Sequence, residues 1–164
     1  MIIKSFIDED FVNYRKPSMF IITPTCNFKC DKENGCLMCQ NSCLVHEPTH
    51  HIHTQLLVNR YLDNPITKAV VFGGLEPFDT IGDVLDFVYE LRAKNCNDDI
   101  VIYTGYTEEE LDKNLAYMDL CKFDNIIVKF GRFRPNQMPH YDEVLGVNLA
   151  SNNQYAKKVS NNEL

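Results

Sequence analysis

The chain has no apolar run approaching the ~18 residues that a membrane-spanning helix needs, and no long low-complexity tract. It is also short of positive charge: 16 Lys and Arg stand against 23 Asp and Glu, a net charge of −7 at pH 7. Nucleic-acid binding depends on neutralising phosphates with Lys and Arg, so this balance argues against it. Because the first residues lack the basic-then-apolar pattern of a signal peptide, we expect a cytoplasmic protein that does not associate with membranes.

The length of 164 residues predicts a single domain with one sizeable core. Short apolar runs, largely β-branched, predict four buried strands at residues 19–23, 69–72, 100–103 and 125–128. Helical patterns lie between them, at about 56–64, at about 80–95, and after Thr107, whose spacing to Glu110 predicts a capping box. We expect that last helix to carry Leu111, Leu115 and Met118. This alternation predicts an α/β fold with a parallel sheet and helices outside it.

Around this core of βα units, residues 18–134, we expect an N-terminal extension at residues 1–17. Residues 135–164 read as an irregular C-terminal segment with short edge strands near 145–147 and 155–159. Ligands bind beyond the carboxyl ends of the strands in such sheets. The cysteine-rich loop and residues 73–77, 103–106 and 129–132 each follow a predicted strand, so we expect these four segments to meet at one rim.

Four of the seven cysteines, Cys26, Cys30, Cys36 and Cys39, lie within fourteen consecutive residues. Reducing compartments keep thiols free, so this clustering indicates metal or redox chemistry more than disulfides. Thiolates at close spacing bind either zinc, with four ligands, or an iron–sulfur cluster. The spacing alone therefore leaves open a structural zinc site made by all four cysteines.

Several segments resemble the radical S-adenosylmethionine enzymes, in the family's order and over most of residues 18–159. Residues 26–30 (Cys-Asn-Phe-Lys-Cys) with Cys39 resemble the loop whose three cysteines hold a [4Fe-4S] cluster. Residues 72–77 (Phe-Gly-Gly-Leu-Glu-Pro) are similar to the Gly-Gly-Glu-Pro segment that binds the cofactor's amino group. Residues 103–109 and 128–133, with Gly146 and residues 151–154, resemble one branch, the activating enzymes of anaerobic (class III) ribonucleotide reductases.

The resemblance implies an open, partial (β/α) barrel with a mainly parallel sheet. It implies Cys26, Cys30 and Cys39 as cluster ligands, with Cys36 as the alternative because Cys36 and Cys39 keep the family's two-residue spacing. The residues it implies for binding S-adenosylmethionine are Phe28, Gly73, Gly74, Glu76, Pro77, Tyr103, Thr104, Gly105 and Lys129. The chain departs from the family in the longer segment 31–38, in Leu75, which interrupts Gly-Gly-Glu, and in Lys129, where many members carry an acidic residue.

The activity implied is that of an oxidoreductase: reductive cleavage of S-adenosylmethionine to a 5′-deoxyadenosyl radical, with no catalytic residue beyond the cluster and the cofactor. That radical would generate a glycyl radical on a large partner, an anaerobic ribonucleotide reductase, with flavodoxin or ferredoxin as electron donor. One alternative is the same chemistry on another glycyl-radical enzyme, a peptide or a small molecule. The other is a non-catalytic zinc module.

The remaining metal-ligating residue types receive structural interpretations. The tract from His46 to His53 is more typical of a solvated loop than of a metal site. Cys43, Cys96 and Cys121 are expected to be small packed residues or inert thiols.

Overall fold

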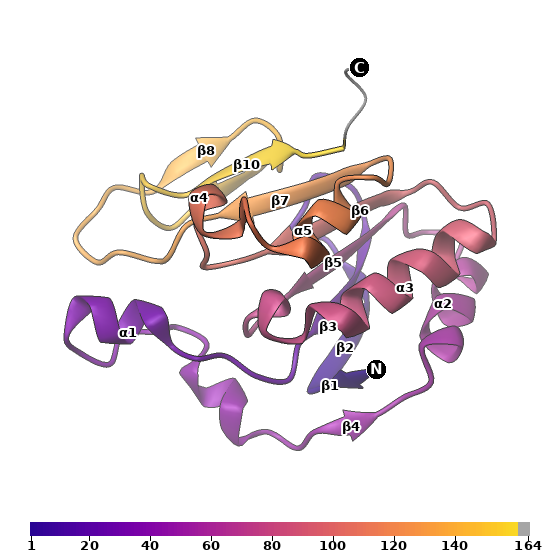
Figure 1. The fold of residues 1–164 in the computed structure, drawn as a ribbon, viewed down its shortest axis with the longest axis horizontal. Helices are drawn as coiled ribbons and strands as arrows, with labels where there is room; N and C mark the ends of the chain where they lie inside the picture. Colours follow the sequence, from indigo (N-terminus) through magenta and orange to yellow (C-terminus); the bar gives the residue numbers. More distant parts are fainter. Residues whose placement is uncertain (161–164) are drawn as a thin grey trace.

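The computed structural model describes residues 1–160, whose centre is a six-stranded sheet in the order β10-β7-β6-β5-β3-β2 (Figure 1). The inner strands β3, β5, β6 and β7 are parallel, and the edge strands β2 and β10 are antiparallel to their neighbours. The strands of this sheet are β2 (Ser5–Asp10), β3 (Ser18–Ile22), β5 (Ala69–Gly73), β6 (Asp99–Tyr103), β7 (Ile126–Phe130) and β10 (Tyr155–Lys158). The four strands predicted from the apolar runs are therefore confirmed in position.

Within residues 1–160, five α-helices accompany the sheet: α1 (Lys29–Asn34), α2 (Thr54–Asp63), α3 (Ile81–Ala93), α4 (Glu108–Leu111) and α5 (Leu115–Leu120). Short 3₁₀ helices, η1 (Ser42–His46) and η2 (Pro77–Thr80), lie in the loops. Two small antiparallel pairs complete the structure: β1 (Ile2–Ile3) with β4 (His50–His51), and β8 (His140–Asp142) with β9 (Val147–Leu149). None of the helices within residues 1–160 is long and apolar enough to cross a membrane.

Alternation along the strands divides the core between the two faces of the sheet. On β5, Val70 and Phe72 join the larger cluster, which includes Phe87 of α3 and other buried side chains of α2, α3 and α5. Val71 belongs to a second cluster on the opposite face, with Leu149 of β9. Helices therefore cover one face, whereas the C-terminal segment covers part of the other.

The prediction of a single helix after Thr107 was wrong in the extent of that helix. The capping box is confirmed, since Thr107 Oγ1 accepts the Glu110 N–H at 3.3 Å and Glu110 Oε2 accepts the Thr107 N–H at 2.9 Å. The helix ends after one turn, and Asn114 caps a second helix by accepting the Tyr117 N–H at 3.1 Å. This break turns Leu115 outward, where it is 77% exposed.

Residues 1–17, expected as an extension, supply the sheet's edge strand β2, which pairs with β3. Its sequence, Ser-Phe-Ile-Asp-Glu-Asp, is largely polar, as edge strands tend to be. The C-terminal strands lie close to the predicted positions. Strand β9 begins two residues later than the predicted 145–147, and β10 falls within the predicted 155–159. Of that segment, residues 161–164 lie outside the described part of the chain.

Candidate functional site

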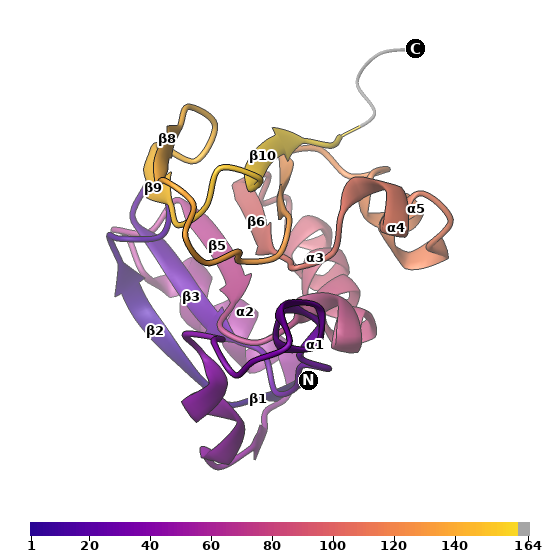
Figure 2. The same cartoon turned by 90° about the vertical axis from the view of Figure 1, so that its left-hand side faces the viewer.

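A cavity of about 530 Å³ lies at the carboxyl ends of the parallel strands, within the ~300–1,000 Å³ typical of small-molecule sites. All four expected segments contribute to it. The predicted site residues that line it are Cys26, Cys30, Cys39, Gly74, Glu76, Tyr103, Thr104, Gly105 and Lys129. Phe28, Gly73, Pro77 and Cys36 lie outside the lining. Figures 1 and 2 place α1 and the loop that follows β7 at this same end of the sheet.

Part of the cavity lining comes from one face of the sheet. Phe20 and Ile22 of β3, Tyr103 of β6 and Lys129 of β7 all line the cavity. Their alternation places them on the face opposite the helices, because Ile21, Ile102 and Val128 belong to the helix-side core. The alternation along each strand therefore determines which side chains face the cavity.

The Gly-Gly segment brings the backbone close to β3. Gly74 has a φ of +81°, and a Cβ there would lie 2.6 Å from Cγ2 of Ile22. Only glycine fits that conformation and that space without displacing the Ile22 side chain. The carbonyl of Gly73 accepts the Thr23 N–H at 3.0 Å and the Thr23 hydroxyl at 3.1 Å, which ties the start of the cysteine loop to the end of β5.

Glu76 is a buried carboxylate that holds two loops together. It accepts the Thr104 hydroxyl at 2.7 Å, the Gly105 N–H at 2.8 Å and the Phe78 N–H at 3.0 Å. Burial raises the pKa of Glu76 to about 6, against the lowering effect of these three donors. The carboxylate thus fixes the loop after β5 to the loop after β6, and most of its hydrogen-bonding capacity is already used.

The cysteine loop is anchored to both of these loops through Asn27. The Asn27 N–H donates to Asp79 Oδ2 at 2.9 Å, and its side-chain amide donates to the Tyr106 hydroxyl at 2.9 Å. The Tyr106 hydroxyl in turn donates to Asp79 Oδ1 at 2.8 Å. This closed network places Cys26, the preceding residue, against the ends of β5 and β6.

The thiols of Cys26, Cys30 and Cys39 are half-buried on the cavity, whereas Cys36 and Cys43 are exposed. Burial raises the pKa of Cys26 to about 12, partly opposed by a hydrogen bond from the Phe28 N–H. Burial also raises the pKa of Cys30 to about 11, and the neighbouring Cys39 thiol adds to the rise. Three thiols on one cavity form a soft donor set, which suits a thiolate-ligated metal centre.

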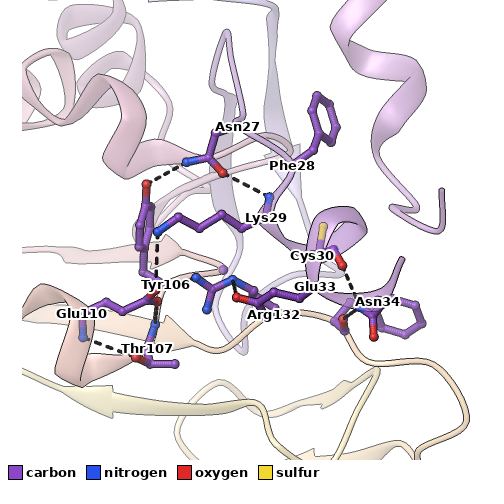
Figure 3. A network of polar contacts seen from close by, with 12 residues as sticks. Asn27, Phe28, Lys29, Cys30, Glu33, Asn34, Tyr106, Thr107, Glu110 and Arg132 are labelled. Carbon is purple, nitrogen blue, oxygen red and sulfur yellow. Dashed lines mark hydrogen bonds and ion pairs between the residues drawn. The ribbon is translucent and has the colours of Figure 1, made fainter. Parts of the chain in front are cut away.

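An ionic network crosses the rim between α1 and α4 (Figure 3). The Arg132 side chain is 8% exposed and lies 2.6 Å from Glu110 of α4 and 3.2 Å from Glu33 of α1. Lys29 also pairs with Glu110, at 3.4 Å, and its ammonium lies 4.3 Å from the centre of the Tyr106 ring. The hydrogen bond from Arg132 is the main cause that lowers the pKa of Glu110 to about 2.

Lys129 places a buried ammonium on the cavity. Its Nζ donates to the Gly131 carbonyl at 2.8 Å. Burial lowers the pKa of Lys129 to about 8, against the opposing influence of Glu76 and Cys30. An ammonium has three donors, so this group is suited to bind an anionic part of a ligand in the cavity.

Two segments near the C-terminus, residues 128–133 and residues 151–154, pack together. Gly131 has a φ of +96°, and a Cβ there would lie 2.9 Å from the Asn153 carbonyl oxygen. The Asn153 side chain donates to the Arg132 carbonyl at 2.8 Å, and the Gln154 side chain donates to the Gly131 carbonyl at 3.3 Å. Residues 151–154 therefore hold the loop that carries Arg132 at the rim.

Sequence reasoning missed the structural roles of Asn27, Asp79, Tyr106 and Glu33. Asn27 and Tyr106 had a signal, since each lies within a motif already singled out. Glu33 and Asp79 had none, because their partners are distant in the sequence and meet only in the fold.

Residues 18–155 match the family described as the 4Fe-4S single cluster domain. The chain belongs to this family. A search of curated proteins and a search of solved structures each gave no match. Membership of the 4Fe-4S single cluster family supports an iron–sulfur protein, and the three thiols on the cavity fit that cofactor.

Within residues 1–160, no three His, Cys, Asp or Glu side chains converge as the ligands of a single metal ion do. The four clustered cysteines therefore do not converge as the ligands of one zinc ion, and neither do the histidines from His46 to His53. A cluster distributes its cysteine ligands over separate irons, so those ligands need not surround one point.

Proposed function

We propose that this member of the 4Fe-4S single cluster family is a radical S-adenosylmethionine enzyme that generates a glycyl radical on an anaerobic ribonucleotide reductase. The observation that carries the proposal is the cavity at the carboxyl ends of β3, β5, β6 and β7. It brings together three cysteines, Gly74 of the Gly-Gly segment, the end of β6 and Lys129, four features far apart in the sequence. On this proposal the open sheet is the partial (β/α) barrel of that superfamily.

Cys26, Cys30 and Cys39 would hold the [4Fe-4S] cluster on the cavity wall. A cluster bound there would supply the electron for reductive cleavage of S-adenosylmethionine to a 5′-deoxyadenosyl radical. The residues of the chain position the cofactor and exclude water, because the difficult chemistry belongs to the cofactors.

The charged groups of S-adenosylmethionine have matching partners in the cavity. The Lys129 ammonium suits the carboxylate of the methionine moiety, since a charge-assisted hydrogen bond in a buried site is strong. Glu76 already accepts three hydrogen bonds, so it contributes by fixing the loops after β5 and β6. On this proposal the amino group is bound by backbone carbonyls of the Gly74–Leu75 segment.

The mouth of the cavity suits a substrate that is itself part of a protein. Val12 lines the cavity and is 73% exposed, so the cavity reaches solvent beside the loop between β2 and β3. A glycine-bearing loop of a large partner would approach through this opening. A reduced flavodoxin or ferredoxin is the proposed electron donor.

The test is to mix reduced, reconstituted protein with S-adenosylmethionine and the host's anaerobic reductase, and to record the electron paramagnetic resonance spectrum. The proposal predicts a glycyl-radical doublet, which should be absent with the Cys39→Ser variant. If wild-type protein cleaves S-adenosylmethionine but yields no doublet, the activity stands and the proposed partner is wrong. A colourless protein that takes up zinc and no iron would overturn the proposal as a whole.

A further inference from the structure

The eight residues between Cys30 and Cys39 form a compact, folded loop. Helix α1 runs from Lys29 to Asn34 and ends at Gly35, whose φ of +69° reverses the chain direction. An unfolded segment of eight residues could extend by up to ~27 Å. The position of Cys39 therefore depends on what holds the two ends of this loop together.

Asp31 is the residue that closes the loop. Its side chain is buried, and the single oxygen Oδ1 accepts the backbone N–H of Met38 at 3.0 Å and that of Cys39 at 2.9 Å. Both hydrogen bonds join the first turn of α1 to the end of the loop. A carboxylate with two backbone donors forms charge-assisted bonds, which are stronger than neutral ones.

These bonds place Cys39 beside Cys30 and leave Cys36 outside. Cys39 lines the cavity, and its thiol interacts with that of Cys30. Cys36 is exposed at the far end of the loop, where its thiol lies 3.6 Å from the Asn34 carbonyl, and the next residue, Leu37, is 93% exposed. For Cys36 to take the place of Cys39, the segment that Asp31 binds would have to move.

We infer that Asp31 is the positioning residue that selects Cys39, and not Cys36, as the third cysteine of the cluster site. This inference rests on the proposed cluster site and deepens it. It explains how a chain with eight residues between the second and third ligands can present its thiols as a compact set.

The first experiment uses cluster-free protein and asks which thiols are neighbours. Mild oxidation with diamide removes two protons and two electrons from a pair of adjacent thiols, and mass spectrometry of the digest identifies the disulfide formed. In wild-type protein we expect Cys39 to couple with Cys30, with Cys36 left free. In Asp31→Ala, coupling that involves Cys36 should increase several-fold.

The second experiment measures iron content and the electron paramagnetic resonance signal after anaerobic reconstitution. Cys36→Ser should match wild type, and Cys39→Ser should lose most of its iron. In the Asp31→Ala background, adding Cys36→Ser should lower the iron content further, since Cys36 can then substitute for Cys39. Asp31→Asn should behave as wild type, because the asparagine side-chain carbonyl oxygen can still accept the N–H groups of Met38 and Cys39. Lys32→Ala, an exposed neighbour on α1, is the matched control.

The inference is overturned if Cys36→Ser loses iron as Cys39→Ser does, or if Asp31→Ala behaves as wild type in both experiments. A thermal melt of the cluster-free variants shows whether Asp31→Ala folds. If it does not, the wild-type disulfide pairing and Cys36→Ser still decide which cysteine is the third ligand, and pairing through Cys36 or a loss of iron in Asp31→Asn would overturn the role of the Asp31 oxygen. Failure of the wild-type protein to take up iron would instead count against the proposed function, and the thiol-pairing experiment would remain decisive for the position of Cys39.

Discussion

Replacement of Glu76 by glutamine tests whether burial of this carboxylate outweighs its three hydrogen bonds and raises its pKa. Burial raises the pKa of Glu76 from 4.5 to about 6 in the folded protein. Each tenfold change in proton affinity corresponds to about 1.4 kcal/mol, so the difference amounts to about 2 kcal/mol. Because the folded protein binds this proton more tightly than the unfolded chain, the stabilisation is complete below pH 4.5 and is lost as the pH rises through about 6.

Glutamine does not titrate, so Glu76→Gln should escape this loss. The free energy of unfolding of the variant minus that of wild type should rise by about 2 kcal/mol between about pH 4 and about pH 7.5. At about pH 4 the variant is expected to be less stable than wild type for a separate reason. The glutamine amide nitrogen cannot accept the Gly105 N–H, and leaving a buried donor unpaired costs about 1–3 kcal/mol.

The assay is urea unfolding of cluster-free, reduced protein at several pH values. Asp86→Asn, which removes an exposed carboxylate from α3, controls for the change in net charge. A difference between Glu76→Gln and wild type that is flat with pH, or that falls as the pH rises, would refute the assignment of Glu76 as a buried, proton-binding carboxylate.

Three further predictions concern Lys129, Gly131 and Glu110. Lys129→Met should weaken binding of S-adenosylmethionine by ~10- to 100-fold in equilibrium dialysis, because a buried charge-assisted hydrogen bond is lost. Gly131→Ala should lower the free energy of unfolding by about 1–3 kcal/mol, whereas Gly82→Ala, in open space on α3, should raise it by up to about 1 kcal/mol. The stability advantage of wild type over Glu110→Gln should shrink as pH falls from 4.5 towards about 2, since Arg132 lowers the Glu110 pKa in the folded state.

Each of these has a contrary result. Unchanged affinity in Lys129→Met would show that its ammonium does not contact the cofactor. Equal effects of the two glycine substitutions in urea unfolding would contradict the close approach at Gly131. A pH-independent difference for Glu110→Gln would mean that the ion pair with Arg132 is not formed in solution.

The central strands of the fold were predictable because they are buried on both faces and read as short, continuous apolar runs. The Thr107–Glu110 capping box was predictable for a similar reason, since its partners lie three residues apart. The strand β2 was not, because an edge strand with a polar sequence lacks the apolar signal. The break before α5 was also missed. The spacing of Leu111, Leu115 and Met118 is compatible with one continuous helix, whereas the Asn114 side chain caps a new helix.

The candidate site shows the same division between local and long-range information. The cysteines and the glycine segment could be assigned from residues close together in the sequence, and strand order predicted that they meet at one rim. The partners of Arg132 and the two hydrogen bonds of Asp31 depend on how α1 folds back on itself and against α4. No spacing of residues in the sequence predicts those contacts.

The most direct test of the account is to incubate anaerobically reconstituted, dithionite-reduced protein with S-adenosylmethionine and to quantify 5′-deoxyadenosine and methionine by chromatography. We predict that wild type and Cys36→Ser form both products in equal amounts, and that Cys26→Ser, Cys30→Ser and Cys39→Ser form neither. A wild-type protein that carries about four irons, as a four-iron cluster requires, and yet releases no 5′-deoxyadenosine would contradict it.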